Sequence, residues 1–430
     1  MGMHIYFSGI GGTGIGPLAL IAHQAGYEVS GSDKQSSQYT AYLQQKGIRL
    51  HIGQSEQQIA AEHRDNPIDW IVYSSALPLE DPHHPELLFA QKNTIRATKR
   101  DAFLNQLITD KHLSMLAVAG THGKTTTTAM LAWVCKSLLL PLSYSVGAKI
   151  DFGDMGYFDE ASKYFAYECD EFDKNFLQFS PAVSLITSID WDHQEIYPNR
   201  DDYKDAFREF ISQSKMTFMH QKDANYLGIE TTPSVTIIDD TDPILQKITL
   251  PGAHNRQNGL LIVKAISAFF EKPVDTIITA LNMFPGSSRR FEKIATNLYS
   301  DYAHTPEEVA ATLQLASELS KNIVVVYEPL TDRRQHFMKD AYKTVFEPAK
   351  QIYWLPSYLA REDTSQTILT PEVLIAGLNN AAHAQVASKN DDLKRQIDAH
   401  LKNGDLVLCM AGGGGGSLDE WIRQQYKNPA

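Results

Sequence analysis

Short apolar runs and longer amphipathic segments alternate along most of the chain. Runs such as 4–8, 70–73 and 114–119 are apolar and too short for helices, which predicts buried strands. A helix-like segment follows the first run and extends to about Ala25. Strands that alternate with helices are typical of parallel sheets. We therefore expect an α/β fold along the whole chain.

Breaks in this alternation predict three domains. The chain has 430 residues, which at about 150 residues per domain also suggests three. One break lies near residue 110, before the apolar run 114–119, and another lies in Pro285-Gly286-Ser287-Ser288. The predicted domains are 1–110, 111–287 and 288–430.

Two segments have the sequence of a helix start. Thr305-Pro306-Glu307-Glu308 places a capping residue before a proline at the first helical position, with an acid at the third. Thr370-Pro371-Glu372 repeats this opening. We expect a capped helix after each threonine.

Composition narrows the class of protein. With 39 basic and 51 acidic residues the net charge is −12, which argues against a broad basic face for nucleic acid. The three cysteines are far apart and include no CxxC pair, which favours a reducing compartment and buried thiols. Neither a signal peptide nor a membrane span is recognisable, so we expect a cytoplasmic enzyme.

The strongest chemical motif is the segment 120–126, Gly-Thr-His-Gly-Lys-Thr-Thr. A glycine-rich turn between a strand and a helix directs backbone N–H groups at phosphate oxygens. Lys124 is expected at the β- and γ-phosphates, and the Thr125 hydroxyl on Mg²⁺. The general pattern has a glycine where this chain has Val118, so it is only partly met.

Two acidic clusters follow predicted strands of the same domain. One is 168–173, Glu-Cys-Asp-Glu-Phe-Asp, and the other is 190–193, Asp-Trp-Asp-His. Open α/β sheets bind ligands at the ends of their strands. Carboxylates at that edge, downstream of a phosphate-binding turn, favour a site for Mg²⁺.

A second glycine motif opens the chain. Gly9, Gly11 and Gly14 match G-x-G-x-x-G, and Asp33 follows at the spacing of a ribose-binding acid. By itself this motif suggests an NAD-dependent oxidoreductase. The same turn would serve any diphosphate, including that of a UDP-sugar, so both interpretations stay open.

Taken together and in this order, the motifs resemble those of the Mur ligase family, the ATP-dependent amino-acid-adding enzymes of peptidoglycan synthesis. The similarity rests on six segments spread over nearly the whole chain: Gly120–Thr126, Glu168–Glu171, Asp192-His193, Gly252–Asn258, Arg289–Glu292 and Asp301–His304. It implies a Rossmann-like N-terminal domain, a P-loop ATPase-like central domain and a Rossmann-like C-terminal domain.

The resemblance also implies a reaction and a set of site residues. ATP would convert a muramyl carboxylate into an acyl phosphate, which an amine would attack to give an amide, ADP and phosphate. The implied catalytic residues are Lys124, Glu168 and His193, and the implied metal ligands are Thr125, Glu168 and His193. The implied ATP contacts are Gly120, Thr121, His122, Gly123, Lys124, Thr125, Thr126, Asn255, Asn258, Arg290 and Asp301. The implied UDP-sugar contacts are Gly11, Gly12, Thr13, Gly14, Asp33, Ser74 and Ser75.

Within the family, the first domain and the phosphate loop are most similar to the member that adds L-alanine to UDP-N-acetylmuramate. That member carries a second histidine after Tyr-Ala-His and a Pro-His-Arg segment, where this chain has Thr305, Leu330 and Thr331. Arg333 and Arg334 are both close enough in sequence to supply the missing cation, and we favour Arg334, with His304, for binding the carboxylate of the amino acid. A ligase that recycles murein tripeptide, and a nucleotide-regulated protein without ligase activity, remain alternatives. The sequence does not give the oligomeric state.

Overall fold

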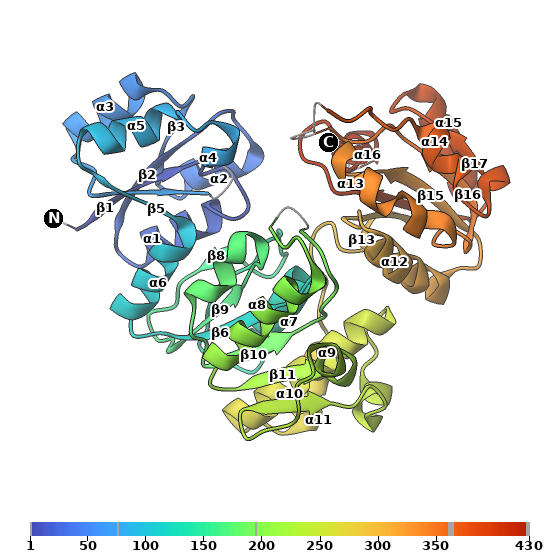
Figure 1. Cartoon of the computed structure of the whole chain (residues 1–430), viewed down its shortest axis with the longest axis horizontal. Coiled ribbons are helices and arrows are strands. Elements are labelled where there is room, and N and C mark those ends of the chain that lie inside the picture. Colours follow the sequence, from blue (N-terminus) through green and yellow to red (C-terminus); the bar gives the residue numbers. More distant parts are fainter. Residues whose placement is uncertain (1, 75–76, 194–195, 360–364, 427–430) are drawn as a thin grey trace. The chain divides into compact units, whose positions relative to one another are not determined.

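The computed structural model describes residues 2–74, 77–193, 196–359 and 365–426. They form three separate β-sheets, each accompanied by helices (Figure 1). These sheets and helices confirm the predicted α/β class. Within the described part of the chain, no helix is both long and apolar enough to cross a membrane.

The first sheet is entirely parallel, with strand order β3-β2-β1-β4-β5. Its strands are β1 (His4–Ser8), β2 (Glu28–Asp33), β3 (Arg49–Ile52), β4 (Trp70–Tyr73) and β5 (Arg96–Lys99). Its helices are α1 (Gly16–Gln24), α2 (Gln38–Gln45), α3 (Glu56–Asp65), α4 (Leu77–Glu80), α5 (Pro85–Lys92) and α6 (Arg100–Asp110). The order changes direction at β1, so the loop after β1 lies at a switch point where such sheets bind ligands.

The second sheet has the order β12-β11-β10-β6-β9-β7-β8 and is parallel apart from its last pair. Its strands are β6 (Ser114–Ala119), β7 (Ser143–Ser145), β8 (Gly156–Tyr157), β9 (Tyr164–Glu168), β10 (Val183–Ile186), β11 (Thr217–His220) and β12 (Val235–Ile238). The α-helices are α7 (Lys124–Ser137), α8 (Arg200–Gln213), α9 (Gln221–Leu227), α10 (Ala253–Phe270) and α11 (Val274–Asn282). Two 3-10 segments, η1 (Phe172–Gln178) and η2 (Pro243–Lys247), complete the set. The central strand β6 is buried from its second residue onward, as its apolar sequence predicts.

The third sheet has the order β13-β14-β18-β15-β16-β17, with only β13 antiparallel to its neighbour. Its strands are β13 (Glu292–Ala295), β14 (Leu298–Asp301), β15 (Ile323–Glu328), β16 (Ala349–Trp354), β17 (Ala384–Val386) and β18 (Leu406–Ala411). The α-helices are α12 (Pro306–Leu319), α13 (Asp332–Met338), α14 (Pro371–Ala376), α15 (Asp391–Lys402) and α16 (Leu418–Tyr426). The segments η3 (Lys339–Lys343) and η4 (Ala381–His383) are 3-10 turns.

The chain divides into two compact units. One contains residues 1–248 with 257–285, and the other contains 249–256 with 286–430. The first two sheets thus belong to one unit and the third sheet to the other. Helix α10 begins in the second unit and continues into the first. The three-domain boundaries near residues 110 and 287 stay predictions.

The two expected helix starts differ in structure. Thr305 caps α12: its hydroxyl accepts the N–H of Glu308, whose carboxylate returns to the N–H of Thr305. Thr370 precedes α14, but its side chain makes no capping hydrogen bond, so the expected cap is wrong there. Cys135, Cys169 and Cys409 are buried and unbridged, as expected.

Candidate active site

The phosphate-loop motif forms a tight turn between β6 and α7. Gly123 has a φ of 83° immediately before the helix, and Gly120 has a φ of 136°. A Cβ on Gly120 would lie 2.4 Å from the hydroxyl of Thr187 and 2.7 Å from the carbonyl of Ser188. The turn therefore requires both glycines: Gly123 mainly for its backbone conformation, and Gly120 for its conformation and for the space around it.

The turn is fixed against the segment that follows β10. The N–H of Thr121 donates to the carbonyl of Ser188 at 2.8 Å, and the N–H of His122 donates to its hydroxyl at 3.1 Å. The hydroxyl of Thr121 donates to the carbonyl of Asp190 at 2.8 Å. These bonds fix the backbone of the loop against the segment that follows β10.

The ammonium group of Lys124 binds to backbone carbonyls of its own turn and to a carboxylate. Its Nζ donates to the carbonyls of Gly120 and Thr121 and lies 2.8 Å from a carboxylate oxygen of Glu171. Burial alone would lower the pKa of Lys124, but Glu171 and neighbouring acids outweigh it and raise that pKa. Burial raises the pKa of Glu171 against the opposing effect of Lys124. The pair is a buried ion pair in the position where phosphates are expected.

Glu168, at the end of β9, contacts the first turn of α7. The hydroxyl of Thr125 donates to Oε1 of Glu168 at 2.9 Å. The other carboxylate oxygen, Oε2, is buried and has no hydrogen-bond partner among the described residues. It faces Gly147, where a Cβ would lie only 2.6 Å away. A buried carboxylate oxygen without a partner beside a threonine hydroxyl is a suitable ligand for a hard cation.

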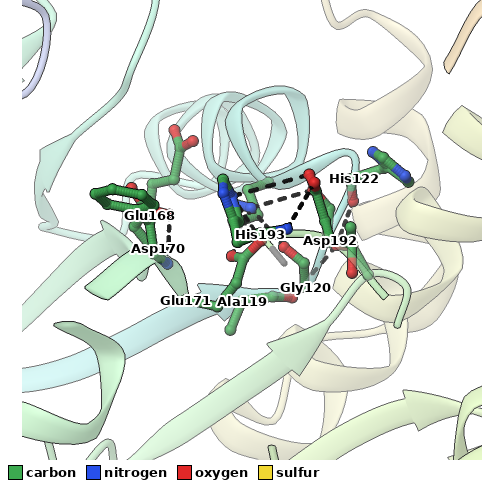
Figure 2. A network of polar contacts seen from close by, with 12 residues as sticks. Ala119, Gly120, His122, Glu168, Asp170, Glu171, Asp192 and His193 are labelled. Carbon is green, nitrogen blue, oxygen red and sulfur yellow. Dashed lines mark hydrogen bonds and ion pairs between the residues drawn. The ribbon is translucent and has the colours of Figure 1, made fainter. Parts of the chain in front are cut away.

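His193 lies with a different pair of acids. One ligand atom from each of Asp170, Glu171 and His193 falls within 4.8 Å of the others. Figure 2 shows His193 beside Asp192 and Glu171, with Glu168 further to one side. The resemblance implies Mg²⁺ at Thr125 and Glu168 and a second ion at His193, and the structure places Asp170 and Glu171 beside His193. Both acids lie in the segment 168–173, for which the sequence predicts a Mg²⁺ site, but neither was named there as an individual ligand.

Asn258 and Asn255 lie one turn apart on α10. Asn258 is buried, and its side-chain nitrogen is 2.6 Å from the position that a Cβ on Gly123 would take. It therefore contacts the phosphate loop directly. Asn255 donates to the carbonyl of Pro251 at 2.9 Å and belongs to the other compact unit.

The first glycine motif forms the turn between β1 and α1. The N–H of Gly11 donates to Oδ2 of Asp33 at 2.8 Å, and a Cβ on Gly11 would lie at the same distance from that oxygen. The motif thus brings together the glycine loop and the acid at the end of β2. Ser74 follows β4 on the same sheet, and Ser75 lies outside the described residues.

Arg290 lies just before β13, and Asp301 is the last residue of β14 in the third sheet. Asp301 accepts the N–H groups of Phe291 and Ala303 at 2.6 and 2.8 Å. Burial raises the pKa of Asp301, against the opposing charge of Arg290. The guanidinium of Arg290 stacks over Tyr302, with 4.8 Å from its carbon to the ring centroid.

His304 and Arg334 meet beyond the ends of β14 and β15. Nη1 of Arg334 is 3.0 Å from Nε2 of His304, and Oε2 of Glu308 is 3.0 Å from Nδ1 of the same ring. Because arginine only donates, Nε2 accepts and the ring hydrogen is on Nδ1. Leu330 and Gly412 line the same place: a Cβ on Gly412 would lie 2.9 Å from Leu330 and 3.0 Å from His304.

Comparison with known families gives three matches in sequence order. Residues 4–112 match the model described as "Mur ligase family, catalytic domain", and residues 118–238 match "Mur ligase middle domain". Residues 289–413 match "Mur ligase, glutamate ligase domain". The first and third segments contain the first and third sheets, and the second contains the second sheet except the start of β6.

Two relatives illustrate the similarity over the full length. A UDP-N-acetylmuramate–L-alanine ligase from Gloeobacter violaceus is 30% identical over 99% of this chain and 96% of its own. One from Clostridium perfringens is 29% identical over 95% of each.

Solved structures agree on the fold. A UDP-N-acetylmuramate-alanine ligase from Thermotoga maritima has a TM-score of 0.75 at 22% identity, covering 99% of this chain and 98% of its own. A murein peptide ligase from Psychrobacter arcticus has a TM-score of 0.68 at 23% identity, with the same coverage.

Proposed function

Because the chain belongs to the Mur ligase family, and so is an ATP-dependent ligase of peptidoglycan precursors, we propose that it joins L-alanine to the carboxylate of UDP-N-acetylmuramate. The observation that carries the proposal is the phosphate loop, whose lysine and threonine each contact a carboxylate of the acidic run that begins at the last residue of β9. The full-length similarity to alanine-adding relatives supports the acceptor. The family match over residues 4–112 removes the case for an NAD-dependent oxidoreductase.

The reaction needs an activated acyl group, because a carboxylate is a poor electrophile. Its oxygen attacks the γ-phosphorus of ATP, ADP leaves, and an acyl phosphate forms. The amine of the amino acid then attacks the acyl carbon, phosphate leaves, and the amine loses a proton. Negative charge develops on the phosphoryl group during its transfer, and fixed cations stabilise this transition state.

Lys124 supplies one such cation. Its present partners are Glu171 and two carbonyls of its own turn, so ATP would have to take over part of these contacts. The γ-phosphate would bring its own negative charge to a lysine that is already buried and aimed into the loop. A cation fixed in this way needs little rearrangement as charge develops.

The residues at the loop also fit Mg²⁺. The partnerless Oε2 of Glu168 and the hydroxyl of Thr125 are oxygen ligands, and Asp170, Glu171 and His193 offer a second group nearby. When bound, the ion would neutralise phosphate charge and polarise the transferred group. Asn258 contacts the loop, and we assign it to the nucleotide.

The glycine loop of the first sheet is assigned to the UDP-sugar. Gly11, Gly12, Thr13 and Gly14 lead into the N-terminus of α1, where backbone N–H groups favour a diphosphate. Asp33 accepts from Gly11 through one oxygen and is suitably placed for a ribose hydroxyl. Ser74 and Ser75 complete the assignment.

Arg334 and His304 are assigned to the carboxylate of the amino acid. Leu330 and Thr331 offer no charge at that place, so a single guanidinium would carry the ionic contact. The lack of charge at Leu330 and Thr331 favours a second candidate, a ligase whose acceptor is murein tripeptide. The carboxylates of a peptide lie farther from its attacking amine than that of a free amino acid does.

A substrate panel tests the proposal. The purified protein is given ATP, Mg²⁺ and UDP-N-acetylmuramate with L-alanine, L-serine, glycine or murein tripeptide, and products are identified by mass spectrometry alongside phosphate release. L-alanine is expected to give the most product. Product with tripeptide alone would assign the second candidate, and no product with any acceptor would indicate a protein without ligase activity.

A further inference from the structure

Arg100 is the first residue of α6 and has no role in the assignments above. It follows β5 directly and carries the chain out of the first sheet. Helix α6 packs against both α1 and η1, the helices that follow the glycine loop and the acidic run. The side chain of Arg100 is only 18% exposed. It is therefore a mostly buried cation between the glycine loop, assigned to the UDP-sugar, and the acidic run, assigned to Mg²⁺.

One end of its guanidinium lies on the glycine loop. Nη1 of Arg100 is 1.9 Å from the position that a Cβ on Gly14 would occupy. Gly14 is not among the residues with positive φ, so its backbone conformation does not demand glycine. The third glycine of the motif is instead needed for space, and Arg100 fills that space.

The other end faces the acidic run. Nη2 of Arg100 is 3.5 Å from Oδ2 of Asp170, and Nε is 3.7 Å from Asp101. Nε has no hydrogen-bond partner in the described part of the chain. A guanidinium has five N–H donors, and the long contact to Asp170 uses one of them. Arg100 thus retains donors for an anion that enters at the glycine loop.

We propose that Arg100 binds the diphosphate of the UDP-sugar, with Asp170 remaining its counter-ion on the ATP side. This inference rests on the proposed function. A planar guanidinium binds phosphate oxygens in pairs and so fixes orientation as well as charge. Held between Gly14 and Asp170, it would orient the UDP-sugar relative to the phosphate loop within one compact unit.

The neighbouring Lys99 provides a matched control. It is the last residue of β5 and pairs with Asp173 in η1, so it also joins the first sheet to the acidic run. Its side chain is 41% exposed, and Lys99 is not among the nearest neighbours of a Cβ placed on any glycine of the loop. Replacing it removes the same charge from the adjacent position.

Calorimetric titration of the full chain tests the proposal with UDP, UDP-N-acetylglucosamine and UDP-N-acetylmuramate. Arg100→Met is expected to raise the Kd of all three by about tenfold to a hundredfold, because all three carry the diphosphate. Arg100→Lys is expected to recover part of the loss. The Kd of ATP should change less than about threefold in each variant, which also reports an intact fold. Lys99→Met should change all four constants by less than that amount.

The outcomes separate this inference from the proposed function. Unchanged binding of UDP by Arg100→Met would overturn the assignment of Arg100. A loss confined to UDP-N-acetylmuramate would also overturn it, since the muramyl carboxylate would then be the bound anion. If the unmodified protein bound none of the three nucleotides, the proposed function itself would fail.

Discussion

At the scale of single residues, the buried pair of Lys124 and Glu171 links catalysis to stability. Lys124→Met leaves a carboxylate that is almost fully buried and has lost its cation. Breaking a buried pair in this way costs about 3–5 kcal/mol. Phosphate release should fall by about a hundredfold or more, because a fixed cation is missing at the phosphoryl group.

The stability cost of Lys124→Met should depend on pH. Burial raises the pKa of Glu171, and removing Lys124 removes an opposing effect, so that pKa rises further. A folded-state pKa above the unfolded one destabilises as pH rises, because the unfolded chain then ionises more readily. The Tm deficit should be small below about pH 4 and grow above it. Adding Glu171→Gln should restore Tm at high pH without restoring activity, and a deficit independent of pH would refute this account.

Glu168 gives a prediction about the metal. Glu168→Gln replaces a charged ligand by a neutral amide, so the Mg²⁺ concentration for half-maximal phosphate release should rise about tenfold or more. Glu160→Gln, on an exposed turn, is the control and should leave the Mg²⁺ requirement unchanged. An unchanged requirement in Glu168→Gln would remove Glu168 from the metal site.

At the scale of elements, the two threonines before α12 and α14 allow a matched test of capping. Thr305→Ala removes a side-chain cap that α12 uses and should lower the free energy of unfolding by about 1 kcal/mol. Thr370→Ala removes no capping bond and should change it by less than about half as much. Chemical denaturation of the unit that contains both helices measures the difference. Equal losses would show that the Thr-Pro-Glu segment stabilises each helix without the capping hydrogen bond.

At the scale of the whole molecule, the assigned sites lie on three different sheets, so their kinetic effects should separate. Arg334→Ala removes a charge-assisted bond to the amino acid and should raise its KM by about tenfold to a hundredfold. The KM values for ATP and the UDP-sugar should change little. Steady-state kinetics with each substrate varied in turn measures this. A rise in the KM of ATP of equal size would place Arg334 at the nucleotide instead.

Periodicity and local motifs were sufficient for the strand and the helix that border the phosphate loop. The apolar run 114–119 forms β6, and α7 begins at Lys124 as the glycine turn predicts. These features depend on neighbours in the sequence, whose sterics and hydrogen bonds the residue types dictate. The order of six motifs was likewise enough to indicate the family that the full-length comparisons establish.

Long-range packing decided which side chains of the candidate site lie together. Sequence alone did not select Asp170 and Glu171 beside His193, because their grouping depends on how β9 and β10 flank β6 in one sheet. It also gave no sign of Arg100, whose partners Gly14 and Asp170 lie 86 and 70 positions away along the chain. The sequence by itself determined which residues form the phosphate loop and the buried strand β6, since these are local properties, whereas the cap it predicts at Thr370 is absent. Only the tertiary structure decided which charged side chains contact each other between the two sheets of the first unit. No local pattern encodes a contact between residues so far apart in the sequence.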